Sequence, residues 1–171
     1  MDTRAPEAAH AAADRHVTAL YRAHALSLAR LALLMLGDRD AAQDVVQDAF
    51  LGLYRRWDKL ASADAAPAYL RASVLNGCRT LLRLRSRPTP PTADESLESA
   101  EAVLIHTEEQ RAMLAAIRRL PVRQREALVL RYYLDMTEDQ AARAMGVSRG
   151  TVKSATSRAI TAIGRMLKEE S

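Results

Sequence analysis

Apolar residues recur at helical spacing through the first half of the chain. Over residues 14–37 this pattern predicts one or two helices, and Asp38 is suited to cap a further helix over 39–60. Pro67 suits the first turn of the next helix, which we expect over 65–85. The apolar positions expected to form the core of these helices are Val17, Leu20, Tyr21, Leu28, Leu31, Leu34, Met35, Val46, Ala49, Phe50, Leu53, Trp57, Leu70, Val74, Cys78 and Leu81.

A second group of helices is predicted after a stretch without helical spacing. Three prolines between residues 88 and 91 oppose helix formation, and the residues that follow them are acidic and polar. Helical spacing resumes over 99–120, and Pro121 opens another helix that ends near residue 135. We therefore expect an all-α fold of two small helical domains on a flexible linker: a frayed tail over 1–13, a first domain over 14–87, the linker over 88–104 and a second domain over 105–171.

The residues after 135 predict a helix-turn-helix. Thr137 and Gln140 have the spacing of a capping box, so a helix should begin there. Gly146 is suited to end that helix, because glycine takes the left-handed conformation of a tight turn without strain. Ser148 can cap the second helix by accepting a hydrogen bond from a free amide. Apolar Val152 then completes the spacing typical of a helix-turn-helix.

The second helix of this unit has two faces of different chemistry. Its apolar positions share one side, and the opposite side carries donors and small hydroxyls but no acid. Such a face can enter the major groove of DNA, where arginine and lysine bind guanine edges. The alternative is the solvated basic face of an ordinary helical hairpin. The apolar side comprises Val152, Ala155, Ala159, Ile163 and Met166, and the candidate DNA side comprises Arg149, Lys153, Ser154, Ser157, Arg158, Thr161 and Arg165.

The charge is unevenly distributed along a chain whose formal net charge is +4. Residues 14–87 carry 12 basic and 7 acidic residues, a difference of +5, and residues 111–168 carry 12 and 4, a difference of +8. Residues 88–110 carry 6 acidic residues and no basic ones. Two basic blocks joined by an acidic strip suggest two polyanion-binding modules on a tether, although arginine-rich helices can also serve solubility alone.

Three further sets of side chains are candidates for binding. Asp44, Gln47, Asp48 and Leu51 share one helix face, and an acidic face on a basic protein suits a basic protein partner better than DNA. Asn76, Arg79 and Arg83 line the outer side of the helix over 65–85, where they suit a DNA strand. Arg123, Arg125 and Arg131 are expected to reach phosphates beside the groove. For the first two sets, a solvated helix face is the alternative.

Catalytic and membrane functions find little support in the sequence. The four histidines lack the spacing of a metal site, and no glycine-rich phosphate loop or activated nucleophile is present. We therefore expect no cofactor, no metal and no enzymatic activity. The best apolar run, over 26–36, carries Arg30 and is shorter than the roughly 18–20 residues that span a membrane. We expect a cytoplasmic protein without membrane insertion.

The motifs together resemble a known family. The segment LYRAHALSLARLALLMLGDRDAAQDVVQDAFLGLYRRW is similar to region two of sigma factors of the sigma-70 class, and LAAIRRLPVRQREALVLRYYLDMTEDQAARAMGVSRGTVKSATSRAI is similar to their region four. The short chain resembles the extracytoplasmic function (ECF) group, and VKSATSRA its SigE-like branch. The resemblance covers nearly all of residues 20–167.

The resemblance implies a subunit that binds core RNA polymerase, recognises the −10 and −35 promoter elements and promotes melting of DNA. It implies that Asp44, Gln47, Asp48 and Leu51 bind polymerase, that Asn76, Arg79 and Arg83 lie at the −10 element, and that the loop over 58–66 holds an extruded base. It also implies that Arg149, Lys153, Ser154, Ser157 and Arg158 read the −35 element. An anti-sigma protein is a further candidate partner.

Two departures from the family and two rival functions bear on these expectations. Many members have Arg-Leu where this chain has Ala155 and Thr156, and Asp where Thr80 stands, so neither promoter element can be copied from relatives. One rival is a stand-alone helix-turn-helix regulator, which would need dimer symmetry and tight binding without polymerase. The other is an adaptor that sequesters a partner protein, which would have no use for Arg149 or Lys153.

Overall fold

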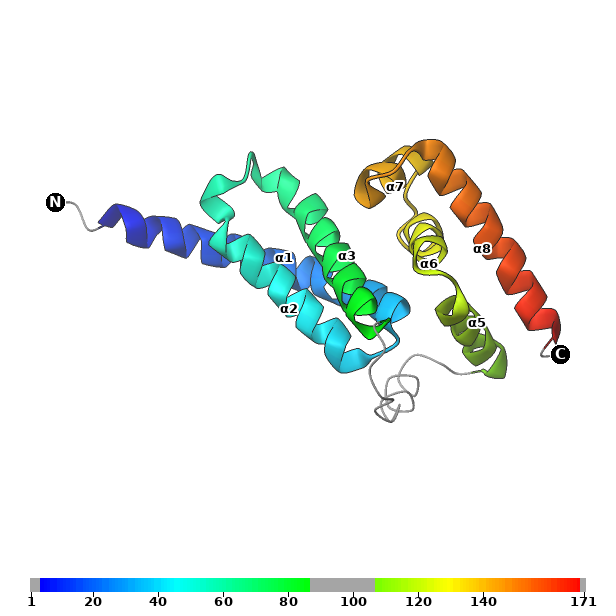
Figure 1. Ribbon diagram of the computed structural model, residues 1–171. Coiled ribbons are helices and arrows are strands. Elements are labelled where there is room, and N and C mark those ends of the chain that lie inside the picture. Colours follow the sequence, from blue (N-terminus) through cyan, green and yellow to red (C-terminus); the bar gives the residue numbers. More distant parts are fainter. Residues whose placement is uncertain (1–3, 87–106, 170–171) are drawn as a thin grey trace.

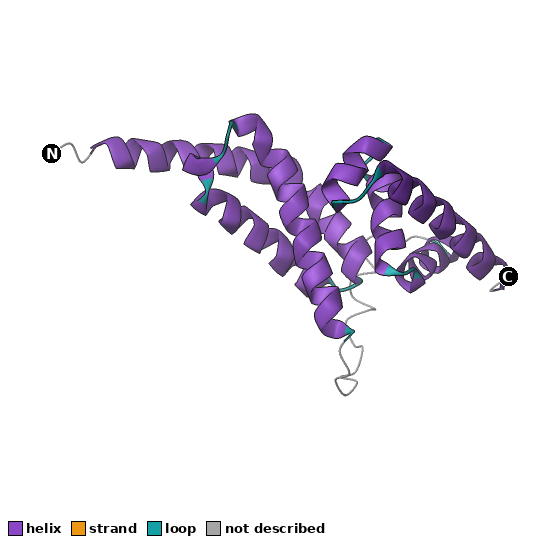
Figure 2. Ribbon diagram, turned by 45° about the horizontal axis from the view of Figure 1, so that its top comes forward, coloured by secondary structure: helices purple, strands orange, loops and turns teal. Residues whose placement is uncertain are grey.

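The computed structural model describes residues 4–86 and 107–169, and within these ranges the chain is helices joined by turns (Figures 1 and 2). Two groups of helices lie side by side, one from each half of the sequence. The first group is α1 (Arg4–Leu36), α2 (Arg39–Arg55), the 3-10 turns η1 (Trp57–Lys59) and η2 (Ala63–Ala65), and α3 (Ala66–Arg85). The second is α5 (Glu108–Arg119), α6 (Val122–Leu128), the π-helical turn η3 (Val129–Tyr133), α7 (Glu138–Met145) and α8 (Arg149–Glu169).

The N-terminal helix is longer than the sequence pattern indicates. The prediction of a frayed tail over 1–13 is wrong from Arg4 onward, because α1 runs without a break from Arg4 to Leu36. The alanines of this segment favour helix intrinsically, and Pro6 lies in the first turn, where its missing N–H breaks no hydrogen bond. The absence of an apolar stripe is therefore poor evidence against a helix in an alanine-rich stretch.

The other predicted helices differ from the structure at their ends. Asp38 caps α2 as expected, since its Oδ1 accepts from the amide of Ala41 at 3.0 Å. The helix expected over 39–60 stops at Arg55, and the one expected over 121–135 changes to a π-helical turn at Val129. The linker over 88–104 lies outside the described residues.

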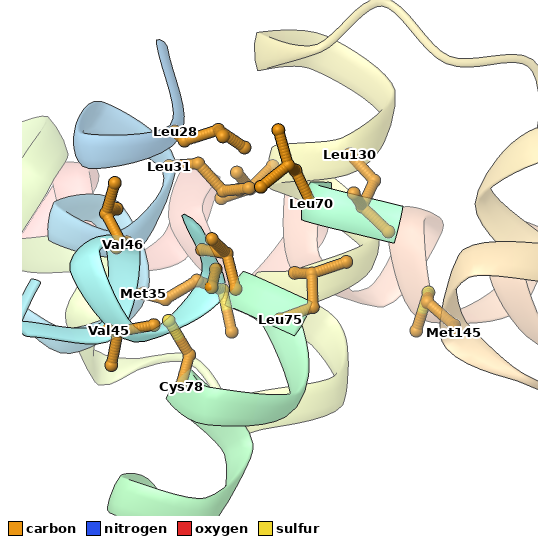
Figure 3. Packing of buried hydrophobic residues seen from close by; sticks show 14 of the residues in the cluster. Leu28, Leu31, Met35, Val45, Val46, Leu70, Leu75, Cys78, Leu130 and Met145 are labelled. Carbon is orange, nitrogen blue, oxygen red and sulfur yellow. The ribbon is translucent and has the colours of Figure 1, made fainter. Parts of the chain in front are cut away.

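The main hydrophobic core contains residues from both groups of helices. Leu31, Met35, Leu53, Leu70 and Cys78 are each fully buried between α1, α2 and α3. Leu130 and Met145 of the second group belong to the same cluster, and Figure 3 shows them beside Leu70 and Leu75 of α3. The two predicted domains are thus packed against each other, an arrangement that the sequence pattern did not predict.

A smaller core holds the second group together. It joins α5, α6 and α8, and its buried members are Ala116, Leu120, Leu128, Ala159 and Ile163. The apolar side of α8 expected from the sequence is confirmed by Val152 and Ala159, which are fully buried, and by Ala155 and Ile163.

Helix α1 is long and apolar enough over Ala11–Leu36 to cross a membrane by length and composition alone. The apolar run judged too short from the sequence is therefore part of a longer candidate. In the structure, however, Leu28, Leu31, Ala32 and Met35 of this stretch are buried in the main core. The buried residues of this stretch lie mainly toward its C-terminal end, where they contact the neighbouring helices, whereas Leu26 is 65% exposed.

Candidate nucleic-acid interface

The helix-turn-helix is formed by α7 and α8, and the local sequence determines its turn. The Thr137 amide donates to Oε1 of Gln140 at 2.8 Å, and the Gln140 amide donates to Oγ1 of Thr137 at 3.2 Å, which is the predicted capping box. Gly146 has a φ of +65°, the left-handed conformation expected at the end of this helix. Oγ of Ser148 then accepts from the amide of Thr151 at 3.1 Å and caps α8. All three sequence predictions for the turn are confirmed.

The outer face of α8 is exposed, as the sequence pattern indicates. The side chains proposed for the −35 element all lie on it: Arg149, Lys153, Ser154, Ser157 and Arg158. The hydroxyls of Ser154 and Thr161 donate to carbonyls of the preceding turn, so they add little of their own to the helix surface. The polar groups that α8 presents to solvent are therefore mainly those of its basic side chains.

The first residue of α8 is held by carboxylates of α7. Nε of Arg149 donates to Oε2 of Glu138 at 2.8 Å, and Nη1 lies 3.9 Å from Oδ2 of Asp139. The hydrogen bond from Arg149 lowers the pKa of the Glu138 carboxyl. This pair is an addition to the sequence prediction, which described only the outer face of α8 as free of acid. The Arg149 side chain nevertheless remains 67% exposed.

A hollow of about 300 Å³ lies between η3, α7 and α8, next to this face. Lys153 and Ser157 line it together with Arg131 and Thr156. Oγ1 of Thr156 is buried and has no hydrogen-bond partner among the described residues. Thr156 is one of the two positions where the chain departs from the Arg-Leu of many sigma factors. The departure therefore changes the lining of the hollow beside the α8 face that is expected to enter the DNA groove.

The three arginines expected at phosphates bind the protein's own backbone. Arg125 is 8% exposed, and its guanidinium donates to the carbonyls of Met35, Arg118 and Leu120. Burial lowers the pKa of Arg125. Arg123 donates to the carbonyl of Met145 at 3.2 Å, and Arg131 donates to that of Met136. In this arrangement Arg125 has no access to a phosphate, whereas the Arg123 side chain remains 57% exposed.

The side chains expected at the −10 element are only partly exposed. Asn76 and Arg83 face solvent on α3. Arg79 lies between them and is paired with Glu126 of α6, and its Nη1 also donates to Oδ1 of Asn76 at 2.7 Å. Glu126 is fully buried, and the sequence pattern did not predict that it pairs with Arg79. The available signal was a single carboxylate in α6, directly after Arg125, three positions after Arg123 and followed by apolar residues.

The acidic face of α2 is open to solvent. Asp44, Gln47, Asp48 and Leu51 are all exposed, and Leu51 is exposed by 51%. Within residues 4–86 and 107–169, the structure shows no hydrogen bond or ion pair from the side chains of Asp44, Gln47 or Asp48. Two unpaired carboxylates beside an exposed leucine form a surface suited to a partner with basic and apolar groups.

Comparison with known proteins gives matches to both halves of the chain. The family model for sigma-70 region 2 matches residues 20–88, and the model for sigma-70 region 4 matches residues 110–163. The ECF RNA polymerase sigma factor SigM of Mycobacterium tuberculosis is 37% identical over 164 residues, which cover 94% of this chain and 82% of that protein. The RNA polymerase sigma-E factor of Streptomyces avermitilis is 31% identical over 83% of this chain and 79% of its own length.

Solved structures with the same fold carry similar names. CnrH, solved in complex with the cytosolic domain of CnrY, superposes with a TM-score of 0.69 and 23% identity over 95% of this chain and 98% of its own. The sigma factor RpoE of Bartonella quintana, solved in complex with the anti-sigma factor NepR, gives a TM-score of 0.62 and 24% identity over 82% and 89% of the two chains. At this identity the likeness establishes a shared fold.

Proposed function

The chain belongs to the sigma-70 family of RNA polymerase sigma factors, in the ECF group, and we propose from this membership which of its surfaces binds each partner. The exposed acidic face of α2 binds core RNA polymerase through Asp44, Gln47, Asp48 and Leu51. The outer face of α8 reads the −35 element, and Asn76, Arg79 and Arg83 of α3 contact the −10 element. The protein thereby directs polymerase to promoters and promotes opening of the duplex.

One observation carries this assignment. A single basic chain exposes an unpaired acidic face on α2 and a cationic face on α8, and the two surfaces suit partners of opposite charge. A promoter strand binds arginine and lysine through phosphates and guanine edges. Carboxylates repel the same strand, so the α2 face has to be explained by a protein partner.

Strand opening is assigned to the loop between α2 and α3. Residues 58–66 leave α2 through the turns η1 and η2, and most of their side chains are exposed. Removing a base from the stack costs a few kcal/mol, so the loop needs both a pocket for the base and the binding energy of polymerase. Two modules that bind DNA weakly by themselves gain effective affinity when polymerase fixes their separation.

Run-off transcription tests the proposal directly. Purified chain is added to core RNA polymerase with genomic DNA, and the 5′ ends of the transcripts are sequenced. We expect new start sites that share two sequence elements and that vanish when the chain is omitted. Transcripts that are identical with and without the chain would contradict the proposal.

The rival reading as a stand-alone regulator is less well supported. It requires a symmetric pair of recognition helices, and it leaves the acidic face of α2 without a function. A footprint of purified chain on a symmetric site in the absence of polymerase would favour it. We further propose a cytoplasmic location, no catalytic activity or cofactor of the chain's own, and an anti-sigma protein as an additional partner.

A further inference from the structure

The N-terminal half of α1 packs against the connection between α2 and α3, which lies beside it (Figures 1 and 2). The imidazole of His16 stacks on the indole of Trp57, the first residue of η1, with ring centroids 5.2 Å apart and ring planes at 30°. On the same turn of α1, the Asp14 carboxylate accepts a hydrogen bond from the hydroxyl of Tyr54, which raises the pKa of Tyr54. Two side-chain contacts therefore attach α1 to the place where the chain leaves α2.

His16 is itself held in place by the helix that carries it. Nδ1 of His16 donates to the carbonyl of Ala12 at 2.7 Å. A carbonyl oxygen can only accept, so the proton is on Nδ1, and the ring is fixed at one edge where it meets Trp57. Ala13 is 6% exposed, so α1 is packed as far as this residue. The extension of α1 beyond the predicted tail thus supplies the carbonyl that orients the stacked ring.

The loop over 58–66 has few restraints of its own. Its two turns, η1 and η2, have no side-chain cap among the described residues. Their backbone hydrogen bonds close single turns, with the Leu60 amide donating to the carbonyl of Trp57 at 3.2 Å and the Ala65 amide to that of Ser62 at 3.1 Å. Hydrogen bonds in such short 3-10 turns have poorer geometry than those of an α-helix. The half-buried side chains of Trp57 and Leu60, which pack against the main core, are therefore the anchors of the loop.

The side chains of this connection are sorted by polarity. Trp57 is half-buried against His16, whereas the polar side chains that follow it are exposed, namely those of Asp58, Lys59, Ser62 and Asp64. These groups can donate to and accept from the edge of an unpaired base. Hydrogen bonds weaken steeply when donor and acceptor are misaligned, so the groups can serve an extruded base only while the loop is held in place.

We propose that His16 and Trp57 are positioning residues for strand opening, and that the N-terminal half of α1 is thereby part of the site that captures the extruded base. The stacked rings fix the start of the loop over 58–66, and the loop presents its polar side chains to the base. His16 acts through Trp57 and needs no contact of its own with DNA. The inference rests on the proposed function, because it adds residues to the site that is assigned there to the loop.

The contribution of the stack has a calculable size. A stacked pair of rings is worth about 2–10-fold in an equilibrium constant beyond its buried area. The two 3-10 turns give the loop little stability of its own, so a released loop competes with the held one once the stack is lost. Promoter opening falls with the fraction of molecules whose loop is in place. Polymerase binding should not change, because the proposed polymerase face on α2 includes neither ring.

Promoter opening by reconstituted holoenzyme tests the proposal. The promoter is one found by run-off transcription, and a fluorescent adenine analogue in its −10 element reports strand opening. His16→Gln removes the ring and keeps a polar side chain, and His16→Phe keeps a ring. Thr18→Ala, at an exposed position of α1, is the control. Melting curves and co-purification with core polymerase establish that each variant is folded and bound.

We expect His16→Gln to open the promoter about 2–10-fold more slowly than the unsubstituted chain. His16→Phe and Thr18→Ala should open it at nearly the unsubstituted rate. A second series of promoters carries an abasic site at one position of the −10 element at a time. Where the captured base is missing, the unsubstituted chain should lose activity and the His16→Gln defect should largely disappear, because the loop has no base to hold.

Three results would overturn the inference: normal opening by His16→Gln, equal defects in His16→Gln and His16→Phe, or a His16→Gln defect of the same size at every abasic position. The last result would mean that the stack stabilises the first group of helices without positioning the loop for a base. A holoenzyme that contains the unsubstituted chain and opens no promoter would instead remove the proposed function, so the two failures can be told apart.

Discussion

Glu138 on α7 accepts a 2.8 Å hydrogen bond from Nε of Arg149, the first residue of α8. The bond joins the two helices of the helix-turn-helix at the end that we propose for the DNA groove. Its terminal nitrogens, of which Nη1 lies 3.9 Å from Oδ2 of Asp139, are the groups that would reach a guanine edge. The pair therefore positions Arg149, and it also places a carboxylate near DNA that would repel phosphates.

This pair predicts a pH-dependent contact between α7 and α8. The bond to Arg149 lowers the pKa of Glu138, so its contribution is present above the unfolded pKa and is lost as pH falls through the lowered value. We expect Arg149→Ala to raise the Glu138 pKa toward its ordinary value in an NMR titration of the side-chain carboxyl. Arg143→Ala, which removes an exposed arginine of α7, should leave that pKa nearly unchanged. An equal shift in both variants would mean that long-range charge is the cause.

Lys153→Glu should block promoter binding by the holoenzyme and leave polymerase binding intact. Lys153 is exposed on the outer face of α8, and one good base contact is worth about 1–3 kcal/mol, or about 5–150-fold in affinity. Reversal of the charge adds repulsion to that loss. Binding is measured by mobility shift and co-purification. Lys168→Glu, at the far end of α8, is the matched control and should bind almost as the parent does. Loss of both activities together would mean that the helix is misassigned.

Asp48→Arg should abolish co-purification with core RNA polymerase while the fold stays intact. Asp48 is exposed on α2 without a partner among the described residues, so its replacement breaks no internal contact. A reversed charge in the middle of a binding face costs several kcal/mol through like-charge contact. Glu108→Arg makes the same change on α5 and should co-purify normally. Unchanged co-purification of Asp48→Arg, with an unchanged melting temperature, would remove the docking assignment.

The sequence predicted the helix-turn-helix in detail because its signals are local. A capping box, a glycine at the turn and a serine cap each depend on residues within four positions, and the structure confirms all three. The packing of α3 against α6 depends instead on contacts between residues far apart in sequence, such as Arg79 and Glu126, which are 47 positions apart. No periodicity within one helix encodes such a pair.

The arginines show most clearly that contacts between distant residues cannot be predicted from the sequence pattern. Arg79, Arg123, Arg125 and Arg131 all look like phosphate ligands in the sequence, because charge alone indicates affinity for anions. The structure gives Arg79 a carboxylate and the other three a backbone carbonyl at a helix end or turn. A helix C-terminus offers unpaired carbonyls to a guanidinium. In a helical protein these carbonyls therefore compete with DNA phosphates for the arginine side chains.

Replacement by alanine should change the stability of the protein in opposite directions at two glycines of the second group of helices. Gly146→Ala places a side chain at φ +65°, where the backbone alone costs about 1–2 kcal/mol, and nothing lies within 4 Å of the new Cβ. Gly164 is inside α8 with equally open space, so Gly164→Ala should stabilise the protein by about 0.5–1 kcal/mol. Urea denaturation of both variants measures the difference. Destabilisation of both to the same degree would show that packing, and not backbone conformation, decides the cost at Gly146.

The substitution Arg125→Lys distinguishes a structural role of this arginine inside the protein from a role in binding DNA. Its guanidinium bonds three carbonyls, those of Met35, Arg118 and Leu120, and thereby ties α6 to the ends of α1 and α5. Hydrogen bonds from a charged group contribute about 1.5–3 kcal/mol, and an ammonium group cannot reach the same three acceptors. We expect a loss of about 2 kcal/mol of unfolding free energy in urea titrations, whereas Arg143→Lys, at an exposed position, should change it by less than about 0.5 kcal/mol. If Arg125 instead bound a phosphate, the lysine variant would keep its stability, and its holoenzyme would lose affinity for promoter DNA.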